Sequence, residues 1–290
     1  MTYVFAPQPI PTLPVTGSTQ LFPVHRIYCV GRNYEEHARE MGHDPKKEAP
    51  FFFQKNPGNL LLGKTMPYPD KTKDFHFEIE LVVALKSGGL NIAATDAMKH
   101  VFGYAVGLDM TRRDLQSDMK KAGRPWEIGK AFENSAPCTA LHPASTIGHP
   151  TKGAIWVDVN GERRQTGDLN QMIWDIPNQI AFLSGLFELR AGDLIFTGTP
   201  AGVGAVKKGD KLHGHVDGVH VPALHEPERT DHAAAEVRSL GRRHGSRSAG
   251  GLTRLEEHAE VHVVPIRRGA AQVLVRGLPI QVLGGELERR

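Results

Sequence analysis

The segment FHFEIELVVAL, from Phe75 to Leu85, limits the possible folds of this chain more than any other feature does. If its apolar run forms a strand, residues i and i+2 point to the same face, so Glu78 and Glu80 are expected side by side. Two such carboxylates raise each other's pKa unless a cation lies between them. A hard divalent ion, Mg²⁺ or Mn²⁺, suits carboxylate oxygens. The segment therefore predicts a strand that carries a metal site.

Other short apolar runs, each bounded by Gly, Pro, Asn or Asp, predict further strands. Besides Glu78–Leu85, we expect strands at Arg26–Val30, Phe51–Gln54, Val101–Leu108, Ala154–Val159 and Asp193–Thr197. The pair Asn160-Gly161 is typical of a hairpin turn after one of them. Many short strands with few long helices are typical of the α+β class.

Helices are expected where polar starts precede mixed apolar segments. Asn33 is the predicted cap of a helix that runs through Met41, with Glu36 at the capping-box position and Gly42 as its end. The other expected helices are Ala94–Lys99, Thr111–Ala122 and Ile173–Phe187, the last of them broken or started by Pro177.

Composition excludes several classes of protein. Apolar residues make up 40% of the 290 residues, enough for a sizeable core, but no apolar run approaches the ~20 residues that cross a bilayer. The Pro-rich start lacks a signal-peptide pattern, so we expect a cytoplasmic protein without a membrane partner. Cys29 and Cys138 are too few for a disulfide scaffold or a zinc site. The net charge of +3 without a basic block disfavours a nucleic-acid partner and favours a small molecule.

The composition changes abruptly near residue 219. Residues 219–290 contain eleven Arg, no Lys and no aromatic residue, whereas residues 1–218 contain fifteen Lys and nine Arg. We therefore expect an extended leader over 1–24, a catalytic domain over 25–218 and an atypical Arg-rich tail that is translated out of frame or is otherwise foreign to the domain. The alternative is a genuine appended segment with short strands at Val261–Ile266 and Gln272–Leu283.

A third carboxylate, Asp109, follows the apolar strand expected over Val101–Leu108. Together with Glu78 and Glu80 it would provide three oxygen ligands and leave positions on an octahedral ion for substrate and water. The alternative is that the two glutamates face solvent from an edge strand. Spacing alone does not decide between these interpretations.

Three further features suggest chemistry, each with an ordinary structural alternative. His37 and Glu40 are three residues apart on the expected helix, as a base and its orienting carboxylate would be, but such pairs are often solvated. Lys130 lies in an apolar frame and is otherwise a surface lysine. The Gly-rich stretch around Thr199 could offer N–H groups and a hydroxyl to a carboxylate, or form a simple turn.

Taken together, the motifs of this chain resemble the fumarylacetoacetate hydrolase family, specifically its acylpyruvate hydrolase branch. The resemblance covers about residues 25–218. It is carried by Cys29-Val30-Gly31-Arg32-Asn33-Tyr34 with His37 and Glu40, His76-Phe77-Glu78-Ile79-Glu80-Leu81, Gly103 to Gln116, Gly123-Arg124-Pro125-Trp126, Lys130, and Thr197 to Gly204. So many matches in one order are highly specific.

The resemblance implies a β-rich mixed β-roll with short helices and a mobile lid helix, usually in a homodimer. It implies that Glu78, Glu80 and Asp109 bind Mg²⁺ or Mn²⁺ and that His37 and Glu40 activate water. Lys130 would stabilise oxyanion charge. It further implies that Arg113, Gln116 and Thr199 contact the substrate. After Val219 the chain departs from the family pattern, in which one further short strand closes the roll.

The implied activity is metal-dependent hydrolysis of a C–C bond in a 2,4-dioxo acid, with fumarylpyruvate cleaved to fumarate and pyruvate in aromatic catabolism. The nearest alternative is an oxaloacetate decarboxylase, or a related 2-oxo acid decarboxylase or isomerase, on the same metal site. A non-catalytic protein that binds a 2-oxo acid or a metal is a third possibility. A fumaryl group would need a cation near its distal carboxylate, and Arg32 and Arg124 are both candidates.

Overall fold

Two β-sheets form the centre of the computed structural model, which describes residues 2–40, 42, 49–219, 259–266 and 270–275. The larger sheet has the strand order β11 (His142–Pro143), β8 (Val101–Leu108), β7 (Ile79–Leu85), β14 (Asp193–Phe196), β3 (Arg26–Gly31), β4 (Phe51–Lys55). The second has the order β13 (Glu162–Asp168), β12 (Ala154–Val159), β16 (Lys211–Val216), β17 (Ala259–Ile266), β18 (Ala270–Val275). Smaller sheets join β15 (Gly204–Ala205), β6 (Phe75–Phe77) and β9 (Thr111–Arg112); β1 (Thr12–Pro14) and β2 (Leu21–Pro23); and β5 (Leu60–Leu61) and β10 (Ala136–Pro137).

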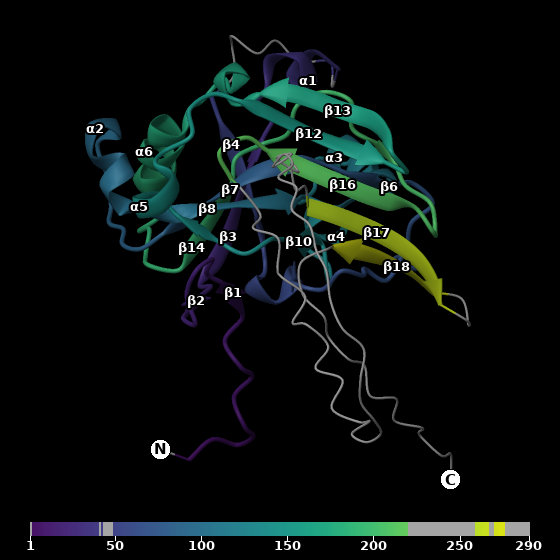
Figure 1. Ribbon diagram of the computed structural model, residues 1–290, viewed down its shortest axis with the longest axis horizontal. Coiled ribbons are helices and arrows are strands. Elements are labelled where there is room, and N and C mark those ends of the chain that lie inside the picture. The colour runs from purple at the N-terminus through teal and green to yellow at the C-terminus, as the bar shows by residue number, and fades with distance from the viewer. Residues whose placement is uncertain (1, 41, 43–48, 220–258, 267–269, 276–290) are drawn as a thin grey trace, which may run out of the picture.

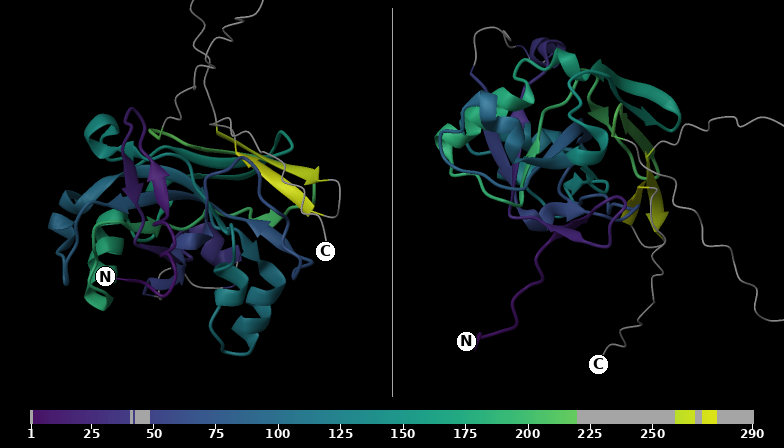
Figure 2. Two further views of the ribbon diagram at one scale, coloured as in Figure 1. Left: turned by 90° about the horizontal axis from the view of Figure 1, so that it is seen from below. Right: turned by 60° about the vertical axis from the view of Figure 1, so that its left-hand side comes forward.

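The sheets are mixed, and helices are short. Strand β14 runs parallel to β3 but antiparallel to β7, which in turn pairs antiparallel with β8. Figures 1 and 2 show the second sheet lying across one face of the larger one, with the helices around them. The helices are α1 (Glu35–Glu40), α2 (Ala94–Ala97), α3 (Arg113–Lys121), α4 (Glu127–Lys130), α5 (Ala144–Ile147) and α6 (Ile176–Leu186), with 3₁₀ turns at Pro57–Asn59, Met98–His100 and Leu169–Gln171. None of the described helices is long and apolar enough to cross a membrane.

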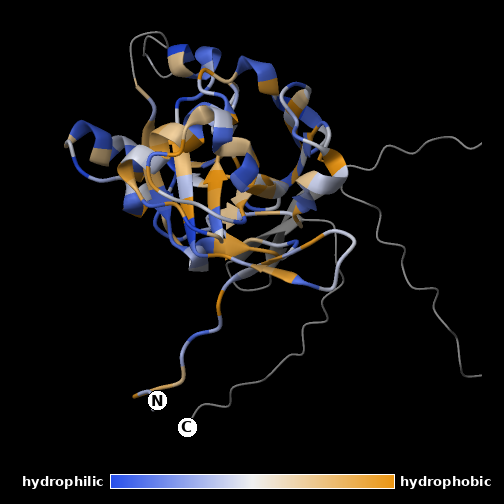
Figure 3. Cartoon of the chain, turned by 90° about the vertical axis from the view of Figure 1, so that its left-hand side faces the viewer, coloured by the Kyte–Doolittle hydropathy of each residue, from blue (hydrophilic) through white to orange (hydrophobic). Residues whose placement is uncertain are grey.

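Strand β7 is buried along its whole length because both of its faces are covered. Leu81 and Val83 belong to the main core cluster, whereas Val82 and Ala84 belong to a second cluster on the opposite face. Figure 3 shows orange, hydrophobic strands in the interior and, around them, helices that carry both hydrophilic and hydrophobic stretches. Glu80 alternates with Leu81 and so lies on the face of Val82 and Ala84. A carboxylate on a buried strand must be compensated locally.

The N-terminal segment differs from the extended leader that the sequence predicts. Residues 12–14 and 21–23 are extended, but they pair as an antiparallel hairpin, β1 with β2. Leu13, Phe22 and Val24 of this segment are buried in the second core cluster. Packing therefore begins before His25, because apolar residues of the segment cover one face of the larger sheet.

Strand predictions agree closely with the structure, whereas three of the four predicted helices begin later than expected; the exception is α2, which begins at Ala94 as predicted. The predicted Val101–Leu108 and Ala154–Val159 coincide with β8 and β12, and Asn160 and Gly161 both have the positive φ of a hairpin turn. The predicted cap Asn33 is wrong: α1 begins at Glu35, and the Asn33 side chain instead bonds to the backbone of Trp174 and Thr197. The helix expected from Thr111 begins two residues later, after a short strand.

Other boundaries shift for local reasons. The helix predicted over Ile173–Phe187 is α6, which starts at Ile176, with Asp175 as its cap and Pro177 in its first turn. The expected end of the first helix at Met41 lies outside the described residues. In the tail, β17 and β18 match the alternative interpretation of short strands, and β17 pairs with β16. The rest of that alternative, residues 276–283, lies outside the described residues.

Candidate active site

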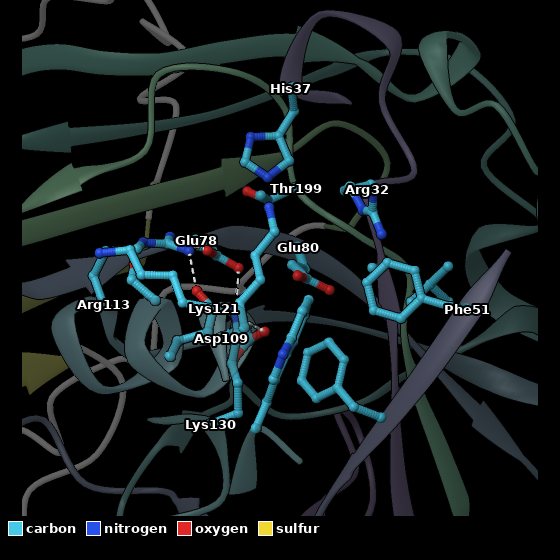
Figure 4. A pocket seen from close by; sticks show the side chains of 17 residues that line it. Arg32, His37, Phe51, Glu78, Glu80, Asp109, Arg113, Lys121, Lys130 and Thr199 are labelled. Atoms are coloured by element: carbon cyan, nitrogen blue, oxygen red, sulfur yellow. Dashed lines mark hydrogen bonds and ion pairs between the residues drawn. The ribbon is translucent and has the colours of Figure 1, made fainter. Parts of the chain in front are cut away.

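A pocket of about 440 Å³ opens beside the larger sheet and contains most of the residues singled out in the sequence (Figure 4). Eight of the nine predicted site residues line it: His37, Glu78, Glu80, Asp109, Arg113, Gln116, Lys130 and Thr199. The ninth, Glu40, lies behind His37 and reaches the site through it. The remaining wall is formed by Val30, Gly31, Arg32, Phe51, Phe53, Ser117, Lys120, Lys121 and Trp126.

Three buried carboxylates lie at the floor of the pocket. Glu78 sits between β6 and β7, Glu80 lies in β7, and Asp109 follows β8 directly. Antiparallel pairing of β7 with β8 brings them together, and the Asp109 N–H donates to the Glu78 carbonyl at 2.8 Å. One oxygen from each carboxylate lies within 4.8 Å of the others. The structure thus brings together the two glutamates that the period-two spacing placed on one face and the aspartate expected at a strand end.

Cations surround the three carboxylates. The buried Lys130 ammonium donates to Glu78 Oε2 at 2.8 Å and to Asp109 Oδ2 at 2.6 Å. Arg113 Nη2 donates to the other Glu78 oxygen. Burial lowers the pKa of Lys130, but Asp109 and Glu78 outweigh it and raise that pKa above its ordinary value. Lys130 is therefore a buried ammonium and not the surface lysine of the alternative interpretation.

The two glutamates have opposite electrostatic environments. Burial raises the pKa of Glu78, but Lys130 and Arg113 outweigh it and hold that pKa below its usual range. Burial, together with Asp109 and Glu78, raises the pKa of Glu80 well above its usual range, against the hydrogen bond from Gly198 N at 2.8 Å. The protein's own cations thus compensate Glu78 far better than Glu80.

The donor set fits a divalent metal ion. Asp109 Oδ1 is buried and lies 2.9 Å from Lys55 Nζ, yet among the described residues no donor is aligned for a hydrogen bond to it. Within the part of the chain that the structure describes, Glu80 has one hydrogen bond, from Gly198, and a charge that its surroundings disfavour. A hard cation between Glu78, Glu80 and Asp109 would satisfy both needs with carboxylate oxygens.

His37 and Glu40 form a pair above this floor. His37 is 5% exposed, and its Nδ1 lies 3.2 Å from Glu40 Oε2 on the next turn of α1. A carboxylate at Nδ1 fixes the proton there and leaves Nε2 as the acceptor. Figure 4 shows the His37 ring directed into the pocket from above the carboxylates. The structure thus places a base and its orienting group over the carboxylate triad.

The loop after β14 supplies Thr199 and secures Glu80. Gly198 has a φ of +98°, and a Cβ there would lie 2.6 Å from the Cβ of Asn33, so glycine is required. Its N–H is committed to Glu80, which differs from the expectation that the loop's N–H groups face a substrate. Gln165 Nε2 donates to Thr199 Oγ1 at 2.9 Å, which leaves the Thr199 hydroxyl hydrogen available to the pocket.

Arg113 is held by a chain of polar contacts that the sequence did not reveal. Its Nη1 donates to Gln116 Oε1 at 2.6 Å, and its Nε donates to His76 Nδ1 at 3.4 Å. Asp74 Oδ1 lies 2.8 Å from the other ring nitrogen of His76. This arrangement fixes the imidazole tautomer that accepts from Arg113.

Lys55 is a further residue of the site that the sequence patterns did not indicate. It ends β4, its side chain is fully buried, and its ammonium contacts Asp109 Oδ1, the Met110 carbonyl at 3.3 Å and the Lys130 carbonyl. The only local signal is a lysine directly after an aromatic strand, Phe51-Phe52-Phe53-Gln54. That pattern gives no hint that the side chain turns inward.

A buried carboxylate triad with a histidine–glutamate pair above it, on a β-rich α+β scaffold, defines a metal-dependent enzyme. The chain belongs to the fumarylacetoacetate hydrolase family, since residues 26–226 match the model for the fumarylacetoacetate (FAA) hydrolase C-terminal region. This confirms the family resemblance, the α+β class and the prediction of an enzyme.

Individual relatives support the same assignment. A fumarylpyruvate hydrolase of Ralstonia sp is 42% identical over 177 residues, 61% of this chain and 92% of that protein. A mitochondrial oxaloacetate tautomerase of Rattus norvegicus is also 42% identical, over 193 residues, 67% of this chain and 87% of that protein. The crystal structure of fumarylpyruvate hydrolase from Pseudomonas aeruginosa in complex with Mn²⁺ and pyruvate is 52% identical, with a TM-score of 0.73 over 75% of this chain and 96% of that one. Together with the buried triad, these relatives support a divalent metal ion and a small keto acid as ligands.

Proposed function

We propose that this enzyme hydrolyses a C–C bond in a 2,4-dioxo acid and that its substrate is fumarylpyruvate, cleaved to fumarate and pyruvate during the breakdown of aromatic compounds. The observation that carries the proposal is the position of the His37–Glu40 pair and the carboxylate triad on one pocket. The relatives named fumarylpyruvate hydrolases support this choice of substrate.

Glu78, Glu80 and Asp109 would hold Mg²⁺ or Mn²⁺, which supplies Lewis acidity to the 2-oxo acid end of the substrate. His37, with Glu40 at its Nδ1, takes a proton from water through Nε2. The water oxygen then bonds to the 4-oxo carbon. The C3–C4 bond breaks with its electron pair going to C3, and C3 takes up a proton to give pyruvate while the acyl part leaves as fumarate.

The remaining predicted residues position the substrate and its charge. Lys130 uses two of its three N–H bonds on Glu78 and Asp109, so one remains for an oxygen of the reacting group. Thr199 has a hydroxyl hydrogen to donate because Gln165 occupies one of its lone pairs. Arg113 and Gln116, linked to each other, present a cation and an amide on the same wall.

A second candidate is decarboxylation or tautomerisation of oxaloacetate on the same site. It is favoured by the oxaloacetate tautomerase relative, which matches this chain at the same 42% identity as the hydrolase does. Those reactions need no attack by water. The His37–Glu40 pair is the feature that favours hydrolysis.

The test is an assay of the purified protein with Mg²⁺ or Mn²⁺ on fumarylpyruvate and oxaloacetate in parallel, with products separated by chromatography. We expect fumarate and pyruvate from the first substrate, loss of activity with EDTA, and a roughly 10²- to 10⁴-fold lower kcat for His37→Ala. Glu40→Gln, which removes the carboxylate at His37 Nδ1, should also lower kcat. Its matched control is Glu36→Gln, because Glu36 is an exposed glutamate of the same helix. Turnover of oxaloacetate alone, or full hydrolysis by His37→Ala, would refute the proposal.

Three further expectations belong to this proposal. A homodimer, predicted from the family resemblance, is tested by light scattering after gel filtration. A cytoplasmic location is tested by cell fractionation. The interpretation of residues 219–290 as an out-of-frame tail is tested by reading the gene in the other two frames after codon 218, where a β-rich ending in one of them is expected.

A further inference from the structure

The mouth of the pocket carries a cation that the proposed mechanism does not use. Lys121 is the last residue of α3 and lines the same pocket as the carboxylate triad. Figure 4 shows its side chain extending into the pocket. Lys130 and Arg113 are each paired with triad carboxylates, whereas Lys121 has no carboxylate partner within the described part of the chain.

The charge of the pocket favours a ligand with two negative groups. Lys55, Lys130 and Arg113 already match the three carboxylates in number, so a bound divalent ion leaves the site positive. One carboxylate of a 2-oxo acid offsets part of that excess. Lys121, which is exposed at the end of α3, adds a further positive charge to the same pocket, and it is not paired with a triad carboxylate. A second carboxylate at the other end of the ligand would pair with it.

The walls of the pocket agree with this arrangement. The triad is buried, so the 2-oxo acid end of a substrate belongs at the floor, whereas Lys121 is exposed at the mouth. Phe51 and Trp126, with ring centroids 5.3 Å apart, line the pocket as an apolar wall suited to an unsaturated carbon chain. The other candidates from the sequence are less suitable: Arg124 does not line the pocket, and the Arg32 guanidinium lies over the Phe51 ring at 4.6 Å.

We propose that Lys121 binds the distal carboxylate of the substrate and so selects dicarboxylic acylpyruvates over those with a neutral acyl group. The inference rests on the proposed function and specifies its substrate class. Lys121 touches the end of the substrate remote from the reacting bond, so it sets specificity and takes no part in bond breaking. Its ammonium and the carboxylate form a charge-assisted pair near the surface.

The test compares kcat/KM for fumarylpyruvate and acetylpyruvate in the wild type, Lys121→Met, Lys121→Arg and the control Arg124→Met. Lys121→Met is expected to lower kcat/KM for fumarylpyruvate roughly 10-fold while leaving acetylpyruvate within about twofold, because only the first compound loses an ionic partner. Lys121→Arg should restore most of the loss. The preference of the wild type for fumarylpyruvate should also shrink as salt is raised.

An equal loss on both substrates, or no loss on either, would overturn the role of Lys121. Failure of the proposed function gives a different result: the wild type would cleave neither compound. In that case calorimetric binding of the two compounds to the Mn²⁺-loaded protein still decides the inference. Tighter binding of fumarylpyruvate that is lost in Lys121→Met would support it, and equal affinities would overturn it.

Discussion

Replacement of the buried Lys55 by Met should destabilise the protein strongly, and more without metal than with it. Lys55 is fully buried and faces Asp109 Oδ1 at 2.9 Å, so its removal leaves a buried carboxylate with one cation fewer. Breaking a buried pair of this kind costs about 3–5 kcal/mol. The Met110 carbonyl also loses its donor at 3.3 Å. At ~2–4 °C per kcal/mol for a domain of this size, the melting temperature should fall by roughly 6–20 °C.

The assay is thermal and urea unfolding in EDTA and in saturating Mn²⁺. A bound divalent ion offsets the charge of Asp109, so Mn²⁺ should stabilise Lys55→Met by more than it stabilises the wild type. Lys99→Met is the matched control, because Lys99 is a surface lysine with 76% side-chain exposure and should change stability by less than about 0.5 kcal/mol. If Lys55→Met lowered the free energy of unfolding in EDTA by less than about 1 kcal/mol, the reasoning would be refuted. It would also be refuted if Mn²⁺ stabilised Lys55→Met and the wild type by the same amount.

Three other perturbations have expected outcomes. The pKa of Glu80 is raised in the folded, metal-free protein, so the folded state holds the proton of this carboxyl to a higher pH than the unfolded chain does. The free energy of unfolding in EDTA should therefore fall as the pH rises from the pKa of Glu80 in the unfolded chain, ~4.3, through its pKa in the folded protein. Glu80→Gln should remove this part of the pH dependence in melting curves from about pH 5 to 8. His76→Leu should raise the KM for fumarylpyruvate about 5-fold, because Arg113 loses the acceptor that holds its Nε. His76→Asn keeps an acceptor and should raise this KM less. The same KM for the wild type and both variants would contradict the role of His76. Burial raises the pKa of Cys138 to about 12 and that of Cys29 well above its usual value, so neither thiol should react with a disulfide reagent at pH 8 until urea unfolds the chain.

The accuracy of the strand predictions has a local cause. The segments that became β8 and β12 combine an apolar run with flanking turn residues, and both signals act over a few neighbouring positions. The start of the first helix was predicted less well, because distant backbone groups take the side chain of its predicted cap, Asn33. Asn33 satisfies backbone groups of Trp174 and Thr197, about 140 and 164 residues away, and is no longer available to α1.

The N-terminal hairpin was missed for a related reason. Residues 1–24 contain many prolines and no long apolar run, which is typical of an extended leader. Leu13 and Phe22 are nevertheless buried, because they pack in one core cluster with Val82 and Leu194 of the larger sheet. Burial of isolated apolar residues depends on the surface they meet, which a local pattern does not contain.

Sequence patterns alone brought the candidate site residues together in short groups: two glutamates at period two, an aspartate at a strand end, and a histidine and a glutamate one helical turn apart. These are short-range relations that backbone geometry translates directly into shared faces. Only the tertiary structure decided which charges are compensated. Lys130 reaches Glu78 across 52 residues and Lys55 reaches Asp109 from another strand, while among the described residues Glu80 accepts a hydrogen bond from a backbone N–H alone. The reason is physical: the energy of a buried charge depends on its desolvation and on partners a few ångströms away in space, and neither quantity follows from separation along the chain.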